Sequence, residues 1–110
     1  MDSITDDYMR EMLQKTKPYT IVILHRTSKY NEPGMDKLVW EHGRRNFQLR
    51  NDGILRIVCP VRDPSDICGL GIFRKDPDET KKIMNEDPGV KAGIFVYETH
   101  PARSFPGDCL

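Results

Sequence analysis

The sequence predicts an α+β fold with helices on one face of an antiparallel sheet, and three observations carry this prediction. Four stretches of strand length are rich in β-branched and aromatic residues. Two stretches with helix signals separate them, one after the first strand and one after the third. At 110 residues, the chain has room for one domain with a modest core.

A further helix is expected at the start, from about residue 3 to residue 15. Its apolar stripe follows helical spacing and consists of Ile4, Tyr8 and Met12, widened by Met9 and Leu13. Ser3 with Asp6 resembles a capping arrangement, and Lys17-Pro18 ends the helix. The first strand, residues 19–24, is β-branched and apolar without interruption, which is typical of a strand covered on both faces.

The helix predicted from about residue 35 to residue 51 carries the first candidate site residue, His42. At about 100° per residue, its inward face consists of Met35, Leu38, Val39, His42, Asn46 and Leu49. Trp40 and Phe47 share the opposite face, where a helix that covers a sheet normally shows only polar residues. We expect them to be covered either by the amino-terminal helix folded back or by another subunit.

The second half of the chain repeats the pattern. Two strands, residues 54–59 and 69–73, flank a loop of turn-forming residues and form a hairpin if that loop closes. A helix then starts with Asp76 as N-cap, Pro77 at N1 and Glu79 at N3, and runs to about residue 86. The fourth strand covers residues 94–99, and the tail that follows from Pro101 is expected to be extended.

The element order is strand, helix, strand, strand, helix, strand, which is the βαββαβ pattern of ferredoxin-like folds, with an extra N-terminal helix. The predicted organisation is a helical extension in residues 1–17, the ferredoxin-like domain in 18–101 and an extended tail in 102–110. Ile94 and Val96 point to one face of the fourth strand, Phe95 and Tyr97 to the other. The open face of the sheet is therefore also apolar, and we expect a homodimer in which two sheets pack into a barrel-like core.

Composition excludes several classes of protein. Seventeen basic residues balance seventeen acidic ones, so no overall field would attract nucleic acid or an anionic membrane. The apolar runs are of strand length and the acidic start does not resemble a signal peptide, which predicts a cytoplasmic location. The cysteines, Cys59, Cys68 and Cys109, have neither zinc-ligand spacing nor the even number of a disulfide framework.

The chain resembles the YCII-related (YciI-like) family of dimeric α+β barrel proteins over roughly residues 19–101. Three motifs carry the resemblance: Glu41-His42 on a helix followed by Asp52-Gly53, a strand that runs into Pro60, and the DPGVKAG stretch at 87–93 with the Glu98–Pro101 strand end. The resemblance implies a ferredoxin-like homodimer with a cleft in which a histidine and an aspartate form a catalytic pair, here His42 and Asp87. It also implies small, often aromatic or enol-type substrates and no nucleotide cofactor.

The sequence departs from the family where Val58-Cys59-Pro60 replaces a glycine-rich approach to the proline. Bulkier residues there would narrow the pocket. The pairing of His42 with Asp87 has independent support, because Asp87 continues the inward face of its helix after Ile83 and Met84. A carboxylate beside an imidazole fixes the tautomer and strengthens the base. The alternative is a buried histidine bonded to backbone, with Asp87 as a turn cap before Pro88-Gly89.

Other polar residues are candidates for substrate binding. Arg56 lies between two apolar neighbours in its strand and is the expected anion contact, and Glu98 and His100 leave the fourth strand on one face. A metal site of His100 with His25 or His42 is conceivable, but polar residues at a strand end are usually solvated, and we assign no metal. Arg44 and Arg45 are expected on a solvated face away from His42.

Two functions remain open at this point. The first is a cofactor-independent enzyme in which His42 and Asp87 carry out acid-base chemistry, an isomerisation or elimination, on a small carbonyl or phenolic metabolite. The second is a non-catalytic module of the same fold that binds a small ligand or assembles with itself. Higher oligomers through Trp40 and Phe47 are compatible with both.

Overall fold

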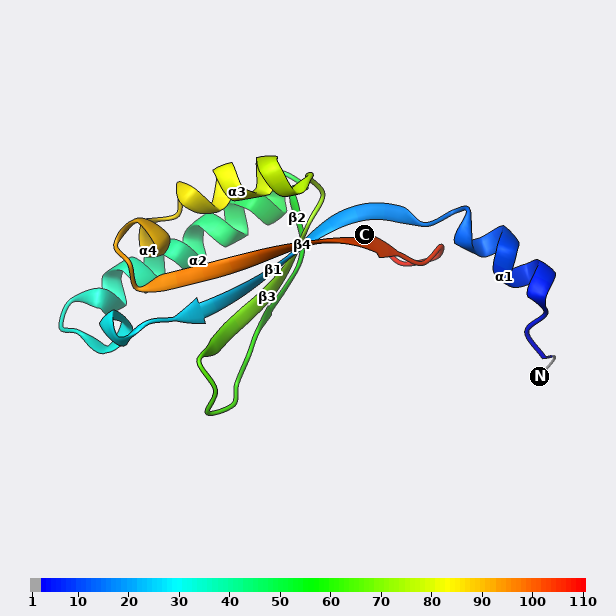
Figure 1. Ribbon diagram of the computed structural model, residues 1–110. Helices are drawn as coiled ribbons and strands as arrows, with labels where there is room; N and C mark the ends of the chain where they lie inside the picture. The colour runs from blue at the N-terminus through cyan, green and yellow to red at the C-terminus, as the bar shows by residue number, and fades with distance from the viewer. Residues whose placement is uncertain (1–2) are drawn as a thin grey trace.

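The computed structural model describes residues 3–110 as one four-stranded antiparallel sheet with helices on one face (Figure 1). In chain order the elements are α1 (Asp6–Leu13), β1 (Lys17–Arg26), η1 (Ser28–Asn31), α2 (Met35–Asn51), β2 (Leu55–Pro60), β3 (Ile67–Phe73), α3 (Pro77–Asn85), α4 (Pro88–Lys91) and β4 (Phe95–Ser104). The strand order β2-β3-β1-β4 is that of the ferredoxin-like fold, so the predicted fold class is confirmed.

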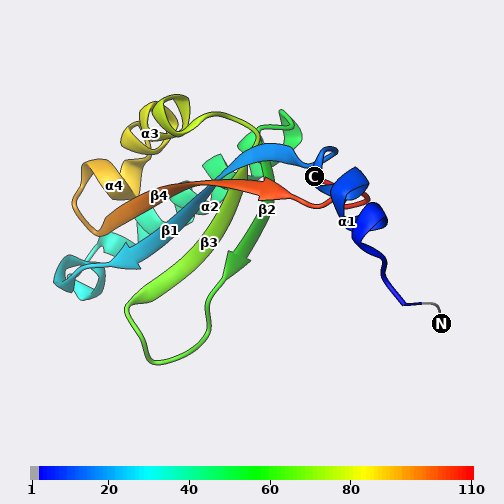
Figure 2. The same cartoon turned by 45° about the vertical axis from the view of Figure 1, so that its right-hand side comes forward.

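The core lies between the sheet and the layer formed by α2, α3 and α4 (Figures 1 and 2). Alternate residues of β1, Val22 and Leu24, point into it and are almost fully buried. They pack with a cluster that consists of Leu49, Leu55, Phe73, Met84, Ile94 and Phe95. This cluster fixes α2 over the middle strands, which is the arrangement that the helical and strand periodicities predict.

The opposite face of the sheet carries apolar side chains and no helix. Ile21 and Ile23 of β1 alternate with the core residues and therefore point away from the helices. Their partners on β3 are Ile72 and Leu70, and Val96 on the edge strand is 53% exposed. The apolar open face inferred from the sequence is thus present in the structure.

The fourth strand was predicted too short, because β4 continues to Ser104 instead of ending at residue 99. Residues 101–104 are not a separate tail, because they continue β4 and pair with residues 17–20 of β1. Pro101 is tolerated in the strand because β4 is an edge of the sheet, where a missing N–H need not break a ladder. β3 ends at Phe73, opposite Thr20, so the first residues of β1 and the last of β4 form a two-stranded ribbon beyond the sheet.

The amino-terminal helix stands at the far end of this ribbon, away from α2 (Figure 1). Thr5, not Ser3, caps α1: its hydroxyl accepts a hydrogen bond from the backbone of Tyr8. Trp40 and Phe47 are 70% and 75% exposed. The expectation that α1 folds back over these aromatics is therefore wrong, because the ribbon holds the helix beyond reach of them.

Across residues 3–110, none of the helices combines the length and apolar character needed to span a membrane.

Candidate active site

His42 and Asp87 face each other beneath the helical layer. His42 lies in the middle of α2, and its Nδ1 is 2.7 Å from Oδ1 of Asp87. The histidine side chain is 13% exposed and that of the aspartate 1%. The structure thus brings the two predicted catalytic residues to hydrogen-bond distance, although they are 45 positions apart in the chain.

Asp87 is also the N-cap of the short helix α4. Its second oxygen, Oδ2, accepts hydrogen bonds from the backbone N–H groups of Gly89 at 2.9 Å and Val90 at 3.1 Å. Asp87 therefore does both things that the sequence suggested: it contacts His42 and it caps the turn. One carboxylate oxygen serves the backbone and the other serves the histidine.

The environment of Asp87 keeps this carboxyl ionised. Burial by itself raises its pKa, but the hydrogen bond and charge of His42, the N–H of Val90 and the nearby Arg45 together lower the pKa below its usual value. Nη1 of Arg45 lies 4.0 Å from Oδ1. The prediction that Arg45 is purely solvated was wrong, because α4 brings Asp87 against the side of α2 as well as its inward face.

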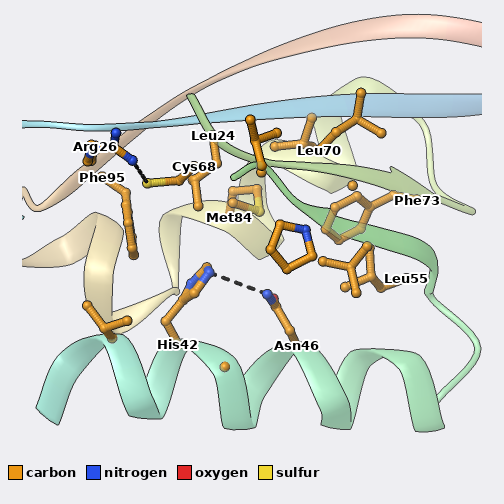
Figure 3. A pocket seen from close by; sticks show the side chains of 18 of the residues that line it. Leu24, Arg26, His42, Asn46, Leu55, Cys68, Leu70, Phe73, Met84 and Phe95 are labelled. Carbon is orange, nitrogen blue, oxygen red and sulfur yellow. Dashed lines mark hydrogen bonds between the residues drawn. The ribbon is translucent and has the colours of Figure 1, made fainter. Parts of the chain in front are cut away.

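The hydrogen bonds of His42 select one tautomer of the neutral ring. Because an ionised carboxylate can only accept, Nδ1 must carry the hydrogen that is donated to Asp87. Nε2 is then the basic nitrogen, and the side-chain amide of Asn46, 3.3 Å away and one helical turn along α2, donates to it (Figure 3). The ring of Phe95 packs beside the imidazole with a centroid distance of 4.7 Å and limits its rotation.

A cavity of about 360 Å³ opens on the Nε2 side of this histidine, between α2 and the sheet (Figure 3). Most of its lining is apolar and comes from β1, β2, β3, α2 and α3, including Val22, Leu24, Val39, Leu55, Val58, Phe73 and Met84. Gly69 and Gly71 alternate along β3 on the cavity side and present no side chain to it. Val58 and Pro60 on β2 take up space in the cavity, and the two glycines on the neighbouring strand β3 leave space free there.

The polar lining residues other than His42 were not among the candidates predicted from the sequence. They are Arg26, Tyr30, Asn46 and Cys68. Asn46 had been placed on the inward face of α2 but without a role. Arg26 could have been found from the strand period: Val22 and Leu24 point into the core, so Arg26, two positions after Leu24, points to the same side of β1.

Arg56, Glu98 and His100 do not line the cavity of His42. Arg56 occupies an irregularity in the pairing of β2 with β3, and its Nε is buried without a hydrogen-bond partner in the described chain. Glu98 and His100 lie on the open face of the sheet, opposite the helices. The structure therefore separates these three residues from the pair formed by His42 and Asp87.

Glu98 bridges two histidines on that open face. One carboxylate oxygen lies 3.0 Å from Nε2 of His25, and the other lies 2.9 Å from Nε2 of His100. These hydrogen bonds lower the pKa of Glu98, and the bond to Glu98, followed by that to Asp66, raises the pKa of His25 against the effect of burial. Within residues 3–110, no group of three or more histidine, cysteine or carboxylate side chains is arranged to hold a metal ion.

No protein-family model matches the chain, and no curated protein matches it significantly. One solved structure to which it is similar is 5-chloro-2-hydroxyhydroquinone dehydrochlorinase from Burkholderia phenoliruptrix AC1100, in complex with 2,5-dihydroxybenzoquinone. The two chains are 19% identical with a TM-score of 0.49, over 78% of this chain and 92% of that chain. The resemblance to the YCII-related family thus rests on the motifs of the sequence.

Proposed function

We propose that this protein is a cofactor-independent enzyme of the YCII-related type, in which His42 exchanges protons with a small carbonyl or phenolic substrate and Asp87 orients it. The observation that carries the proposal is the 2.7 Å contact between His42 Nδ1 and Asp87 Oδ1. It leaves Nε2 as a base beside an apolar cavity. A positioned general base contributes about 10²- to 10⁴-fold to a rate.

The reaction needs no further reactant. Nε2 of His42 takes a proton from a carbon next to a carbonyl group, and the electrons of the C–H bond form a C=C bond while the carbonyl electron pair moves to oxygen. Where the substrate also has a C=C bond conjugated with the enolate, return of the proton from the imidazolium to the far carbon of that bond shifts the double bond and completes an isomerisation. Loss of a leaving group from the neighbouring carbon completes an elimination. The apolar walls exclude water from the intermediate.

Asp87→Asn separates the two tasks of Asp87. The amide oxygen can still accept from Gly89 and Val90, so α4 keeps its cap, since asparagine caps about as well as aspartate. The amide nitrogen then faces Nδ1 of His42 and donates to it. This forces the hydrogen onto Nε2 and removes the base from the cavity.

The test measures loss of deuterium to water, by NMR, from α-deuterated cyclic ketones that perturb the His42 ring resonances and therefore bind. The protein should speed exchange, whereas His42→Gln and Asp87→Asn should reduce it by about 10²-fold or more. His100→Gln, a histidine outside the cavity, should keep the normal rate. If a bound ketone exchanges no faster than it does free in buffer, the catalytic proposal is wrong.

The alternative is a non-catalytic module in which the cavity holds a small metabolite. The capping hydrogen bonds from Asp87 to Gly89 and Val90 favour it, because they account for the aspartate without chemistry. Binding of a ketone without acceleration of exchange would identify this case.

We further propose that the protein forms a homodimer through the open faces of its sheets, with higher oligomers through Trp40 and Phe47. Support comes from the apolar side chains of Ile21, Ile23, Leu70 and Ile72 on a face without helices. A stable interface buries roughly 800 Å² on each partner.

Val96→Lys tests the sheet interface without a folding cost, because Val96 is 53% exposed on the edge strand. Measured by light scattering, the variant should have the mass of one chain, whereas Trp40→Ala should remain at least a dimer. An unchanged mass for Val96→Lys would contradict the sheet interface. Loss of states above the dimer in Trp40→Ala would support the aromatic contact, and retention of those states would contradict it.

A further inference from the structure

Arg26 stands out because it is a permanent positive charge in a mostly apolar cavity. It is the last residue of β1 and lies on the same side of the strand as Val22 and Leu24. Guanidinium groups in such surroundings are normally paired with a carboxylate. None of the ion pairs within residues 3–110 includes Arg26.

The guanidinium is held in place by neutral groups. Nη2 donates to the backbone carbonyl of Ser65, and Nη1 lies 3.7 Å from Sγ of Cys68. The charge of Arg26 helps to lower the pKa of Asp63, which belongs to the same loop as Ser65, although the hydrogen bonds from Ser65 are the larger causes. Its carboxylate is already bonded to the backbone and hydroxyl of Ser65. Neutral hydrogen-bond partners therefore hold the guanidinium of Arg26 in place, and no carboxylate of the described chain forms an ion pair with it.

The positive charge and the base lie on opposite walls. In Figure 3, Arg26 and Cys68 belong to the sheet side of the cavity, whereas His42 and Asn46 project from α2 below. A molecule that fills the space between them would touch the base on one side and the cation on the other. The volume, about 360 Å³, exceeds the roughly 150 Å³ that accommodates benzene, which leaves room for one substituted six-membered ring.

We infer that Arg26 is the anion-binding residue of this cavity, and that its ligands are single-ring compounds whose oxygen is, or becomes during proton transfer, a phenolate or enolate. This inference rests on the proposed function and assigns the residue that binds the anionic oxygen of the ligand. When Nε2 of His42 removes a proton, the electron pair ends on the ring oxygen, and Arg26 stabilises that oxyanion. Arg26 takes the role that the sequence had suggested for Arg56, which lies outside the cavity.

The test compares two probes of nearly equal shape. 4-Nitrophenol is anionic at a pH above its pKa, whereas 4-nitroaniline stays neutral, and both can be titrated into the protein by calorimetry. The wild-type protein should bind the anion more tightly. Because hydrogen bonds to charged groups contribute about 1.5–3 kcal/mol, Arg26→Met should weaken anion binding by roughly 10- to 100-fold and change binding of the neutral probe little.

The matched control is Arg56→Gln, which removes a cation outside the cavity and should leave the preference for the anion intact. Arg26→Lys keeps the charge without the planar fork and should retain part of the preference, which gives a second variant if the loop at Ser65 needs a cation to fold. If the wild type shows no preference, or if both Arg26 variants keep it in full, the assignment is wrong.

The outcome is independent of the exchange assay. His42→Gln removes the base but leaves Arg26, so it should still prefer the anionic probe. A preference for the anion without any ketone exchange would support the anion site and refute the catalytic role of His42. If the wild-type protein accelerates exchange but shows no preference for the anionic probe, and Arg26→Met exchanges at the normal rate, the anion site is refuted and the base stays in place.

Discussion

Gly89→Ala should destabilise the protein, because the added methyl group would collide with the ring of Phe95, which also packs against His42. A Cβ at Gly89 would lie 2.4 Å from Cδ2 and 2.7 Å from Cε2 of Phe95, whereas carbon atoms in contact are normally about 3.5–4.0 Å apart. The ring would have to move by about 1 Å. Phe95 is 3% exposed, and the ring of His42, with a centroid 4.7 Å away, opposes movement on that side.

The expected cost follows from overpacking, which typically destabilises a core by about 1–3 kcal/mol. The gain in helix propensity, up to about 1 kcal/mol, offsets part of it. The same substitution at Gly43 is the control. Gly43 lies inside α2, and a Cβ there meets nothing within 4 Å, so Gly43→Ala should stabilise by about 0.5–1 kcal/mol.

Urea unfolding followed by far-UV circular dichroism measures both changes, at one fixed protomer concentration because self-association adds to apparent stability. The two alanine variants should shift the midpoint in opposite directions with unchanged m-values. If Gly89→Ala is as stable as Gly43→Ala, the space around Phe95 is not closely packed, and the argument that Phe95 fixes the ring of His42 fails.

Three further changes have defined outcomes. Asp76→Ala removes the N-cap of α3, whose carboxylate accepts from Glu79 at 2.8 Å, and should cost about 1 kcal/mol in urea unfolding; no change would show that α3 does not depend on its cap. Thr20→Val removes a fully buried hydroxyl that donates to the backbone carbonyl of Lys75 at 2.7 Å, and should lower the free energy of unfolding by about 1–2 kcal/mol; an unchanged value would show that this hydrogen bond adds nothing net to stability. The hydrogen bond to Glu98 raises the pKa of His25 above 6.5 in the folded protein. The stability that this pair adds is therefore complete below pH 6.5 and is lost as the pH rises through the folded-state pKa of His25. Glu98→Gln should flatten this part of the pH profile of stability, and identical profiles for the variant and the wild type would exclude a contribution from the pair.

The elements that bury one face were predictable from the sequence, because burial imposes a period. The helix that starts at Met35 and ends at Asn51 is an example, as is the cap of α3 at Asp76. The ends of β1 and β4 were predicted too short. Their outer residues pair only with each other, so no core enforces alternation there, and Pro18 and Pro101 look like terminators although the edges tolerate them.

The same distinction applies to the candidate site: residues on a buried, periodic face were predictable, and the others were not. His42 and Asp87 were found because each continues an apolar helix face, and their contact follows from the packing of two helices. Arg26 was missed because the first strand was ended at Leu24, although alternation places the arginine on the cavity side. Arg56 was chosen for its apolar neighbours, but an irregularity in the strand pairing turns it away from the cavity, and no local pattern marks such an irregularity.

The double use of Asp87 has a consequence for how the motif around it can be interpreted in other chains. The turn uses a side-chain oxygen at position 87 to start α4 whether or not a histidine stands opposite. The backbone hydrogen bonds alone are a sufficient reason for an Asp-Pro-Gly stretch at this turn. Under the proposed function the informative position is therefore His42, whose side chain makes no hydrogen bond to the backbone in the described fold, and a chain with the aspartate alone would keep the turn without the base.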